Sequence, residues 1–246
     1  KAFGWSRTQM TMGQASSALL SLVFAPFVGV LIDRLGPRKL ALPGLVLLSA
    51  CTALFSVLNG SIGQWMGLWL LWGAASLLCQ STLWSTAVAN IFVTSRGLAL
   101  GVTLSGTALA QVIVPPLTTW LITEWGWRVA FIGLGLGWGA VALVLSFLFL
   151  REVGEAGEAG AGKVSAVRAR FASGPGLSIA QAWRDSSLWR VAIATFLILT
   201  ITIAVTVHQI PIYRSAGIGA FNAAWLASLS GFAGIAGKLI TGTLID

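Results

Sequence analysis

Four polar side chains lie within apolar stretches of the sequence, where ionisable or hydrogen-bonding groups are costly and mark functional positions. They are Lys238, His208, Gln80 and Gln111. An ammonium that faces a cavity binds a carboxylate as a point charge, whereas one that turns toward the aqueous interface only anchors its helix. The sequence leaves both roles open for Lys238, and we take all four residues as candidate substrate-binding positions.

His208 is the single histidine of the chain and lies close to the helix-breaking Pro211. Imidazole titrates near neutral pH, so His208 would support coupling to protons, and it would equally serve as a hydrogen-bonding or gating residue. Gln80 and Gln111 would either line a cavity or bond a neighbouring helix. The sequence therefore offers binding and coupling groups, and we expect no catalytic residue.

The composition indicates a membrane protein. Hydrophobic residues make up 57% of the chain and charged residues 9%, against about 25% charged residues in ordinary soluble domains. The net charge of +8 comes from basic residues in short loops, not on a continuous face, so we expect no nucleic-acid partner. Cys51 and Cys79 lie in apolar runs without nearby His or Asp, so neither a metal nor a cofactor is expected.

Seven stretches are long enough to cross a bilayer, which needs about 20 apolar residues per helix. They are residues 10–32, 40–58, 65–90, 98–122, 128–150, 189–212 and 219–245. The sequence thus predicts an all-α, multi-pass protein whose first partner is the lipid bilayer. Residues 151–188 form the long polar stretch, which reads as a linker that ends in a short interfacial helix over 178–183, capped by Ser178.

Lysine and arginine fall mainly on one side of these spans. One set of loops holds Arg34, Arg38, Lys39, Arg96, Arg151, Lys163, Arg168, Arg170, Arg184 and Arg190. The opposite set holds Lys1, Arg7, Arg128 and Arg214. The positive-inside rule makes the first set of loops cytoplasmic. We expect the protein to lie in the inner or plasma membrane of the cell. The first span then runs inward, and we expect one more helix upstream of it.

A short motif occurs twice. The loop after the first span contains Gly29, Asp33, Arg34, Gly36, Arg38 and Lys39, and the chain ends on Gly242-Thr243-Leu244-Ile245-Asp246, which repeats Gly29-Val30-Leu31-Ile32-Asp33. An acid at such a helix end can pair with a facing arginine or helix N-terminus, and the pair can break when neighbouring helices move. We expect these residues to form a conformational-gating loop and its repeat.

The stretch from Gly29 to Lys39 resembles the signature loop between helices two and three of the major facilitator superfamily. The resemblance implies that the chain is a fragment covering helices two to eight of that twelve-helix fold. Residues 1–150 would be the N-terminal half without its first helix, 151–188 the cytoplasmic linker between halves, and 189–246 the start of the C-terminal half.

Within the superfamily, the run from Phe92 to Gly101, followed by Ser105-Gly106-Thr107, is similar to the signature entering helix five of monocarboxylate transporters and oxalate/formate-type antiporters. Arg96, Gly101 and Gly106 carry this likeness, although Ile91, Thr94 and Ser95 depart from it. Those relatives place a cation, usually Arg, where this chain has Lys238. The resemblance thus implies a cationic substrate site in the last span.

Pro115 and Pro116 lie within the span 98–122. Each removes a backbone donor from the helix, so we expect a kink that serves as a hinge.

The residues and the resemblance together predict secondary active or facilitative transport of a small organic anion, such as a monocarboxylate, by alternating access. Symport or antiport would be coupled to protons if His208 titrates. Two other functions stay open: efflux of a drug-like or neutral metabolite by the same fold, and a membrane sensor or scaffold that does not transport.

Overall fold

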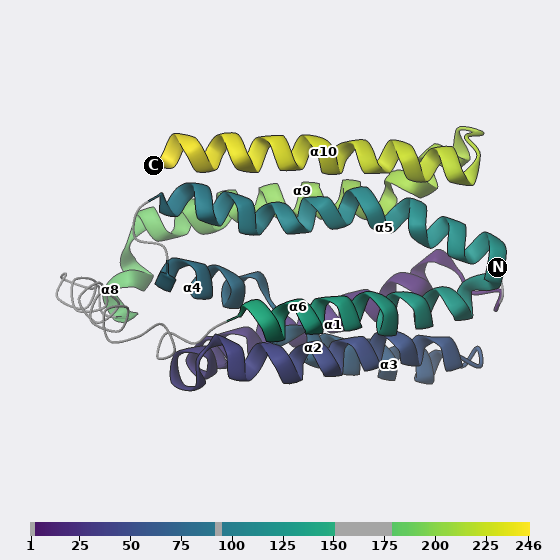
Figure 1. Ribbon diagram of the computed structural model, residues 1–246, viewed down its shortest axis with the longest axis horizontal. Helices are drawn as coiled ribbons and strands as arrows, with labels where there is room; N and C mark the ends of the chain where they lie inside the picture. The colour runs from purple at the N-terminus through teal and green to yellow at the C-terminus, as the bar shows by residue number, and fades with distance from the viewer. Residues whose placement is uncertain (1–2, 92–94, 151–178) are drawn as a thin grey trace.

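A computed structural model describes residues 3–91, 95–150 and 179–246, and every regular element in these ranges is a helix. In chain order they are α1 (Arg7–Leu35), α2 (Pro37–Leu54), the 3₁₀ helix η1 (Phe55–Val57), α3 (Ile62–Leu77), α4 (Ser81–Ile91), α5 (Arg96–Ile132), the π-helix η2 (Gly133–Trp138), α6 (Gly139–Phe149), α8 (Ile179–Arg184), α9 (Ser186–Ser215) and α10 (Ala220–Ile245). The long helices run roughly parallel to one axis of the molecule (Figure 1). The predicted all-α fold is confirmed.

Six stretches are long and apolar enough to cross a membrane, and one of them, Arg96–Leu148, contains 53 residues. A straight helix of that length would extend about 80 Å, against about 30 Å for the hydrocarbon core. It reverses instead at Gly126, whose backbone angles of φ 82° and ψ 166° are open to glycine. This stretch therefore supplies two crossings, so all seven predicted spans correspond to described helices.

The helix ends follow from local sequence. Ser6 and Gln9 form a reciprocal capping box at the start of α1, with each side chain accepting from the other residue's backbone N–H. Gly36, at φ 83°, ends α1, and Pro37 occupies the first turn of α2, where a missing N–H costs nothing. The tight turn after the first span is therefore built by the Gly36-Pro37 pair.

The third predicted span, 65–90, differs from expectation because it is broken into α3 and α4. The backbone leaves the helix between Leu78 and Gln80. The indole N–H of Trp84 donates to the carbonyl of Cys79 at 3.2 Å, and Gly44 of α2 packs against Leu78, where an added Cβ would lie 2.7 Å from the leucine Cβ. Irregular backbone at membrane depth needs such protein partners.

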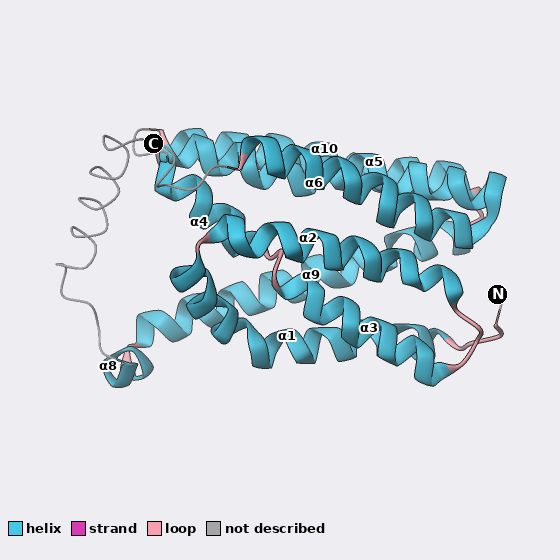
Figure 2. Ribbon diagram, turned by 60° about the horizontal axis from the view of Figure 1, so that its bottom comes forward, coloured by secondary structure: helices cyan, strands magenta, loops and turns pink. Residues whose placement is uncertain are grey.

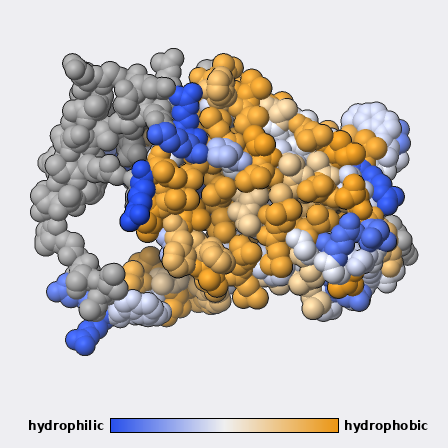
Figure 3. All heavy atoms as spheres, turned by 90° about the horizontal axis from the view of Figure 1, so that it is seen from below, coloured by the Kyte–Doolittle hydropathy of each residue, from blue (hydrophilic) through white to orange (hydrophobic). Residues whose placement is uncertain are grey.

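The outer surface of the bundle is apolar. Every residue of α9 is at least partly exposed, with Phe196 at 68% and Ile201 at 65%. Figure 3 shows a hydrophobic face across the middle of the molecule, with hydrophilic side chains near its ends. Such a surface is stable in lipid and not in water, so the chain is a multi-pass membrane protein.

The loops rich in Lys and Arg gather at one end of the bundle, which we call the basic end: the α1–α2 turn, the start of α5, and α8 (Figures 1 and 2). The short helix predicted over 178–183 is present as Ile179–Arg184, whereas its expected cap Ser178 and most of the linker lie outside the described residues. The α5–α6 reversal lies at the opposite end. This arrangement agrees with the predicted sorting of basic loops.

Candidate functional site

Helices α5 and α10 lie side by side and antiparallel, although they belong to different predicted halves (Figure 1). Glycines let the two backbones touch. A Cβ added to Gly97 would lie 2.5 Å from the carbonyl oxygen of Gly242, and one added to Gly101 would lie 2.8 Å from that of Lys238. Gly101 and Gly242, both singled out in the sequence, therefore have the same role of close helix approach.

Gly106, the third residue of the predicted helix-five signature, does not share this role. A Cβ added there would meet no atom of the described residues within 4 Å. The structure thus assigns a packing function to Gly101 and none to Gly106.

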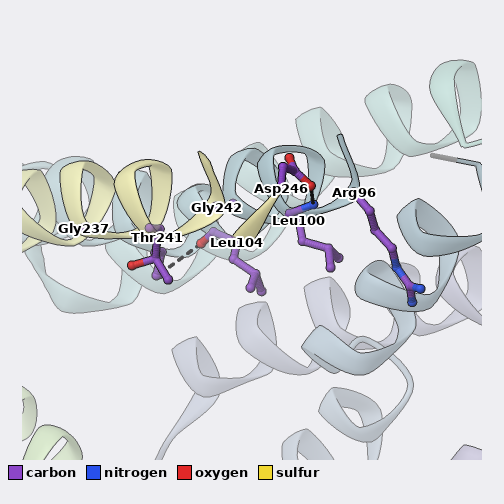
Figure 4. A pocket seen from close by; sticks show the side chains of 10 residues that line it. Arg96, Leu100, Leu104, Gly237, Thr241, Gly242 and Asp246 are labelled. Carbon is purple, nitrogen blue, oxygen red and sulfur yellow. Dashed lines mark hydrogen bonds between the residues drawn. The ribbon is translucent and has the colours of Figure 1, made fainter. Parts of the chain in front are cut away.

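At the basic end, Asp246 caps the N-terminus of α5. Its two carboxylate oxygens accept hydrogen bonds from the backbone N–H groups of Gly97, at 2.6 Å, and Leu98, at 2.8 Å (Figure 4). Ser95, the residue that would normally cap this helix, has a left-handed backbone (φ 56°), and its side chain makes no capping bond within the described chain. The start of one helix is thus stabilised by the end of another.

Asp246 is the acid of the repeated motif, and it pairs with a helix N-terminus, one of the two partners considered for such an acid; its part in gating stays a prediction. An anion at this position gains from both the unpaired N–H groups and the helix dipole. Arg96 lines the same groove, and in Figure 4 its side chain points away from Asp246.

The first copy of the motif is described only in part. Gly36 makes the turn, Arg34 lies in the last turn of α1, and the Arg38 guanidinium lies 6.0 Å from the ring centre of Phe147 on α6. A Cβ on Gly29 would meet no described atom within 4 Å. The side chain of Asp33 lies outside the described residues, so gating by this copy, Lys39 included, stays a prediction.

Lys238 of α10 reaches α5. Its Nζ donates to the carbonyl of Leu104 at 3.0 Å and to the Thr107 hydroxyl at 2.6 Å. The Lys238 backbone is level with Gly101, so the side chain extends along α5 away from the basic end. A helical side chain leans toward the N-terminus of its own helix, and that end of α10 is the opposite end of the bundle.

The direction of this side chain bears on the two roles left open. Thr107 lies about 16 Å along the axis of α5 from Arg96, at 1.5 Å per residue, which is about half the thickness of a bilayer core. A lysine that anchors a helix at the interface would point toward the basic end. The observed contacts point the other way and favour a role within the membrane.

A groove between α5 and α10 connects Lys238 with the Asp246 cap. It has a volume of about 610 Å³, and its lining includes Leu100, Leu104, Thr241 and Gly242 (Figure 4). One cation thus lies at its inner end, and a capping carboxylate lies at its outer end.

The two prolines of α5 keep helical backbone angles, and the non-helical residue described inside this helix is Gly126. Pro116 has no backbone N–H, so the Val112 carbonyl, four residues earlier, lacks its usual helical donor. The hydroxyl of Ser228, a fully buried residue of α10, donates to that carbonyl at 2.8 Å. The hinge expected at Pro115 and Pro116 stays a prediction, but the freed carbonyl has a defined partner on the other helix.

The other three candidate binding residues do not gather at one place. His208 is exposed on α9, in a shallow pocket of about 440 Å³ with Pro211 and Ser215, and does not line the α5–α10 groove. Gln80 is half-buried at the α3–α4 break, and Gln111 is exposed on α5, one turn beyond Thr107. Gln111 thus follows Thr107, a contact of Lys238, on the same helix, whereas His208 and Gln80 lie outside the α5–α10 groove.

Sequence reasoning missed Thr107 and Ser228 as contact residues. A signal for Thr107 was present, because Thr107, Gln111 and Thr118 follow each other at helical spacing and so share one polar face of the helix. Ser228 had no such signal, since its partner is a backbone carbonyl.

A bundle of membrane-crossing helices with an internal sequence repeat is typical of membrane transporters. The whole chain, residues 1–246, matches the family model of the Major Facilitator Superfamily. The chain belongs to this superfamily of membrane transporters.

Several curated proteins are similar to parts of the chain. Monocarboxylate transporter 13 of Bos taurus is 28% identical over 226 residues, covering 90% of this chain and 49% of the relative. Riboflavin transporter RibJ of Trypanosoma brucei brucei is 29% identical over 126 residues, covering 51% and 23%. The probable sulfoacetate transporter SauU of Cupriavidus necator is 32% identical over 160 residues, covering 56% and 34%. The chain spans about half the length, or less, of these relatives.

Proposed function

We propose that the protein transports small organic anions of the monocarboxylate class by alternating access, in the inner or plasma membrane. The observation that carries this proposal is the Lys238 ammonium of α10, which reaches α5 and donates to the Leu104 carbonyl and the Thr107 hydroxyl. A cation held there costs free energy that only a functional role repays. A carboxylate entering the groove would offset that cost as a counterion.

The relatives support an anion without singling one out. Two of those described above are named for monocarboxylate and sulfoacetate, both anions, whereas a third is named for riboflavin. A further relative from Gibberella fujikuroi is named as a fujikurins efflux protein. The second candidate is therefore efflux or uptake of a larger neutral metabolite, which the apolar lining of the groove by Leu100 and Leu104 favours.

The gating step in this proposal is the making and breaking of the α5–α10 contact. Residues 1–150 and 189–246 would move relative to each other about the linker 151–188. The Asp246 cap would hold the basic end closed, and its loss would open the groove. The proposed coupling ion is the proton, with His208 as the candidate residue that binds it.

The test is uptake by the full-length gene product, reconstituted in liposomes, with labelled acetate, lactate, pyruvate, sulfoacetate and riboflavin as probes. Lys238→Ala is expected to abolish carboxylate uptake, and Lys238→Arg to retain part of it because the charge remains. Arg190→Ala is the matched control, since it also removes one positive charge but lies on exposed α9 outside the groove.

Carboxylate uptake that survives Lys238→Ala would refute the anion proposal. Uptake of riboflavin but of no carboxylate would favour the neutral candidate, and a well-folded protein that carries none of the probes would favour a sensor or scaffold.

A further inference from the structure

Three hydrogen bonds close a triangle at the inner end of the α5–α10 groove. The Lys238 ammonium donates to the Leu104 carbonyl and to the Thr107 hydroxyl, at 3.0 and 2.6 Å. The Thr107 hydroxyl donates its own proton to the same Leu104 carbonyl, at 2.8 Å. The position of the ammonium is therefore fixed by two groups of α5, not by its own flexible stem.

The donors of this triangle can be counted. A lysine ammonium has three N–H donors and a threonine hydroxyl has one. Two donors of Lys238 and the single donor of Thr107 are engaged. One N–H of Lys238 has no partner among the described residues. What this end of the groove still offers a ligand is one charged donor, which suits an anionic acceptor.

A second donor lies one turn further along α5. Gln111 follows Thr107 by four residues, so the two side chains share a face of the helix about 5–6 Å apart. Gln111 is exposed, and its amide makes no hydrogen bond within the described part of the chain. A carboxylate has two oxygens, and the ammonium N–H and the Gln111 amide N–H are two donors that can each take one.

The part of the groove next to Lys238 discourages a second negative charge. Between Lys238 and the basic end its lining is Leu100, Gly101, Thr241 and Gly242, and the Asp246 carboxylate and Arg96 follow at the outer end. The second carboxylate of a short dicarboxylate would lose water without gaining a cation, because Arg96 lies about 12 Å along α5 from Leu104.

We propose that Thr107 is a positioning residue that aims one N–H of Lys238 at the substrate, so that Lys238 and Gln111 together receive a single carboxylate and the site selects monocarboxylates over dicarboxylates. This inference rests on the proposed function, because it requires that Lys238 binds the substrate.

The test compares Thr107→Val, Thr107→Ser and Thr103→Val in the reconstituted full-length gene product. Thr103→Val is the matched control, since its hydroxyl also donates to a carbonyl of its own helix, that of Ala99 at 2.8 Å, but does not contact Lys238. Labelled lactate gives KM and the maximal rate, and malonate serves as the competing dicarboxylate.

Thr107→Val should raise the KM for lactate about tenfold, as expected when a hydrogen bond to a charged group is lost. The maximal rate should change little, and the preference for lactate over malonate should fall, because the released ammonium regains a second free donor. Thr107→Ser should behave like the parent protein.

Kinetics of Thr107→Val equal to those of Thr103→Val would overturn the proposal. Equal loss of affinity for lactate and malonate would also overturn it, since a merely structural role predicts that result. These outcomes are distinct from failure of the proposed function, in which Lys238→Ala leaves lactate uptake intact or the parent protein carries no monocarboxylate. If the proposed function fails in either of these ways, this inference fails too.

Discussion

The Asp246 cap on α5 gives the sharpest test of gating, because two changes at one position separate its charge from its hydrogen bonds. Asp246→Asn keeps a side-chain oxygen that can cap the helix and removes the charge, whose interaction with a helix dipole is worth about 0.3–1 kcal/mol. Asp246→Ala also removes the hydrogen-bond acceptor, and the loss of such a cap typically costs about 1 kcal/mol more. Since Asp246 is exposed, solvent screening favours the lower values.

These magnitudes translate into populations. We expect Asp246→Asn to shift the equilibrium toward the state open at the basic end by about two- to fivefold, and Asp246→Ala by about tenfold, at about 1.4 kcal/mol per factor of ten. In the proposed gating step the cap stabilises the closed state through Gly97 and Leu98, so the shift follows the bonds that are lost.

The assay is the rate at which a membrane-impermeant maleimide labels Leu100→Cys, in a background where Cys51 and Cys79 are alanine. Leu100 lines the groove and is half-buried in the closed contact. A Leu188→Cys control, on exposed α9 at the basic end, should label at one rate in all variants. If the maleimide labels Leu100→Cys at the same rate with Asp246 present and with Asp246→Ala, the gating argument is refuted.

Two further predictions concern the same helix pair. Ser228→Ala leaves the Val112 carbonyl without its donor, so the full-length gene product in detergent should lose about 1–3 kcal/mol of stability, seen as a lower melting temperature; an unchanged melting temperature would mean that this bond is not needed. Gly101→Ala should separate α5 from α10 and cost about 1–3 kcal/mol by overpacking, whereas Gly106→Ala, which meets no described atom within 4 Å, should be neutral in the same assay.

Much of the fold could be predicted because membrane helices are encoded by length and hydropathy. The seven spans, the Gly36-Pro37 turn and the short helix before Ser186 all follow from local sequence. The break between α3 and α4 could not be predicted, since residues 78–80 contain neither Gly nor Pro. Contacts with Gly44 and Trp84 accompany that break, and such contacts are invisible in one apolar run.

The site was predictable in its residue types but not in its partners. The repeat indicated that an acid such as Asp246 would pair with a facing arginine or a helix N-terminus, yet nothing in the spacing identified α5 as the partner. Lys238 stood out because charges are rare in the membrane, but the direction of its side chain follows from the α5–α10 packing. His208 stood out for the same chemical reason, and it lies outside the groove.

Helix α5 relies on α10 to satisfy some of its own backbone hydrogen-bonding groups. Its first turn takes its cap from Asp246, 149 residues after Gly97, and the carbonyl released by Pro116 takes its hydrogen bond from Ser228, 116 residues after Val112. Since α10 follows α5 in the chain, the Ser228 hydroxyl can reach the Val112 carbonyl only after α5 has been synthesised. Helix α5 therefore gains these two contacts only once α10 lies beside it.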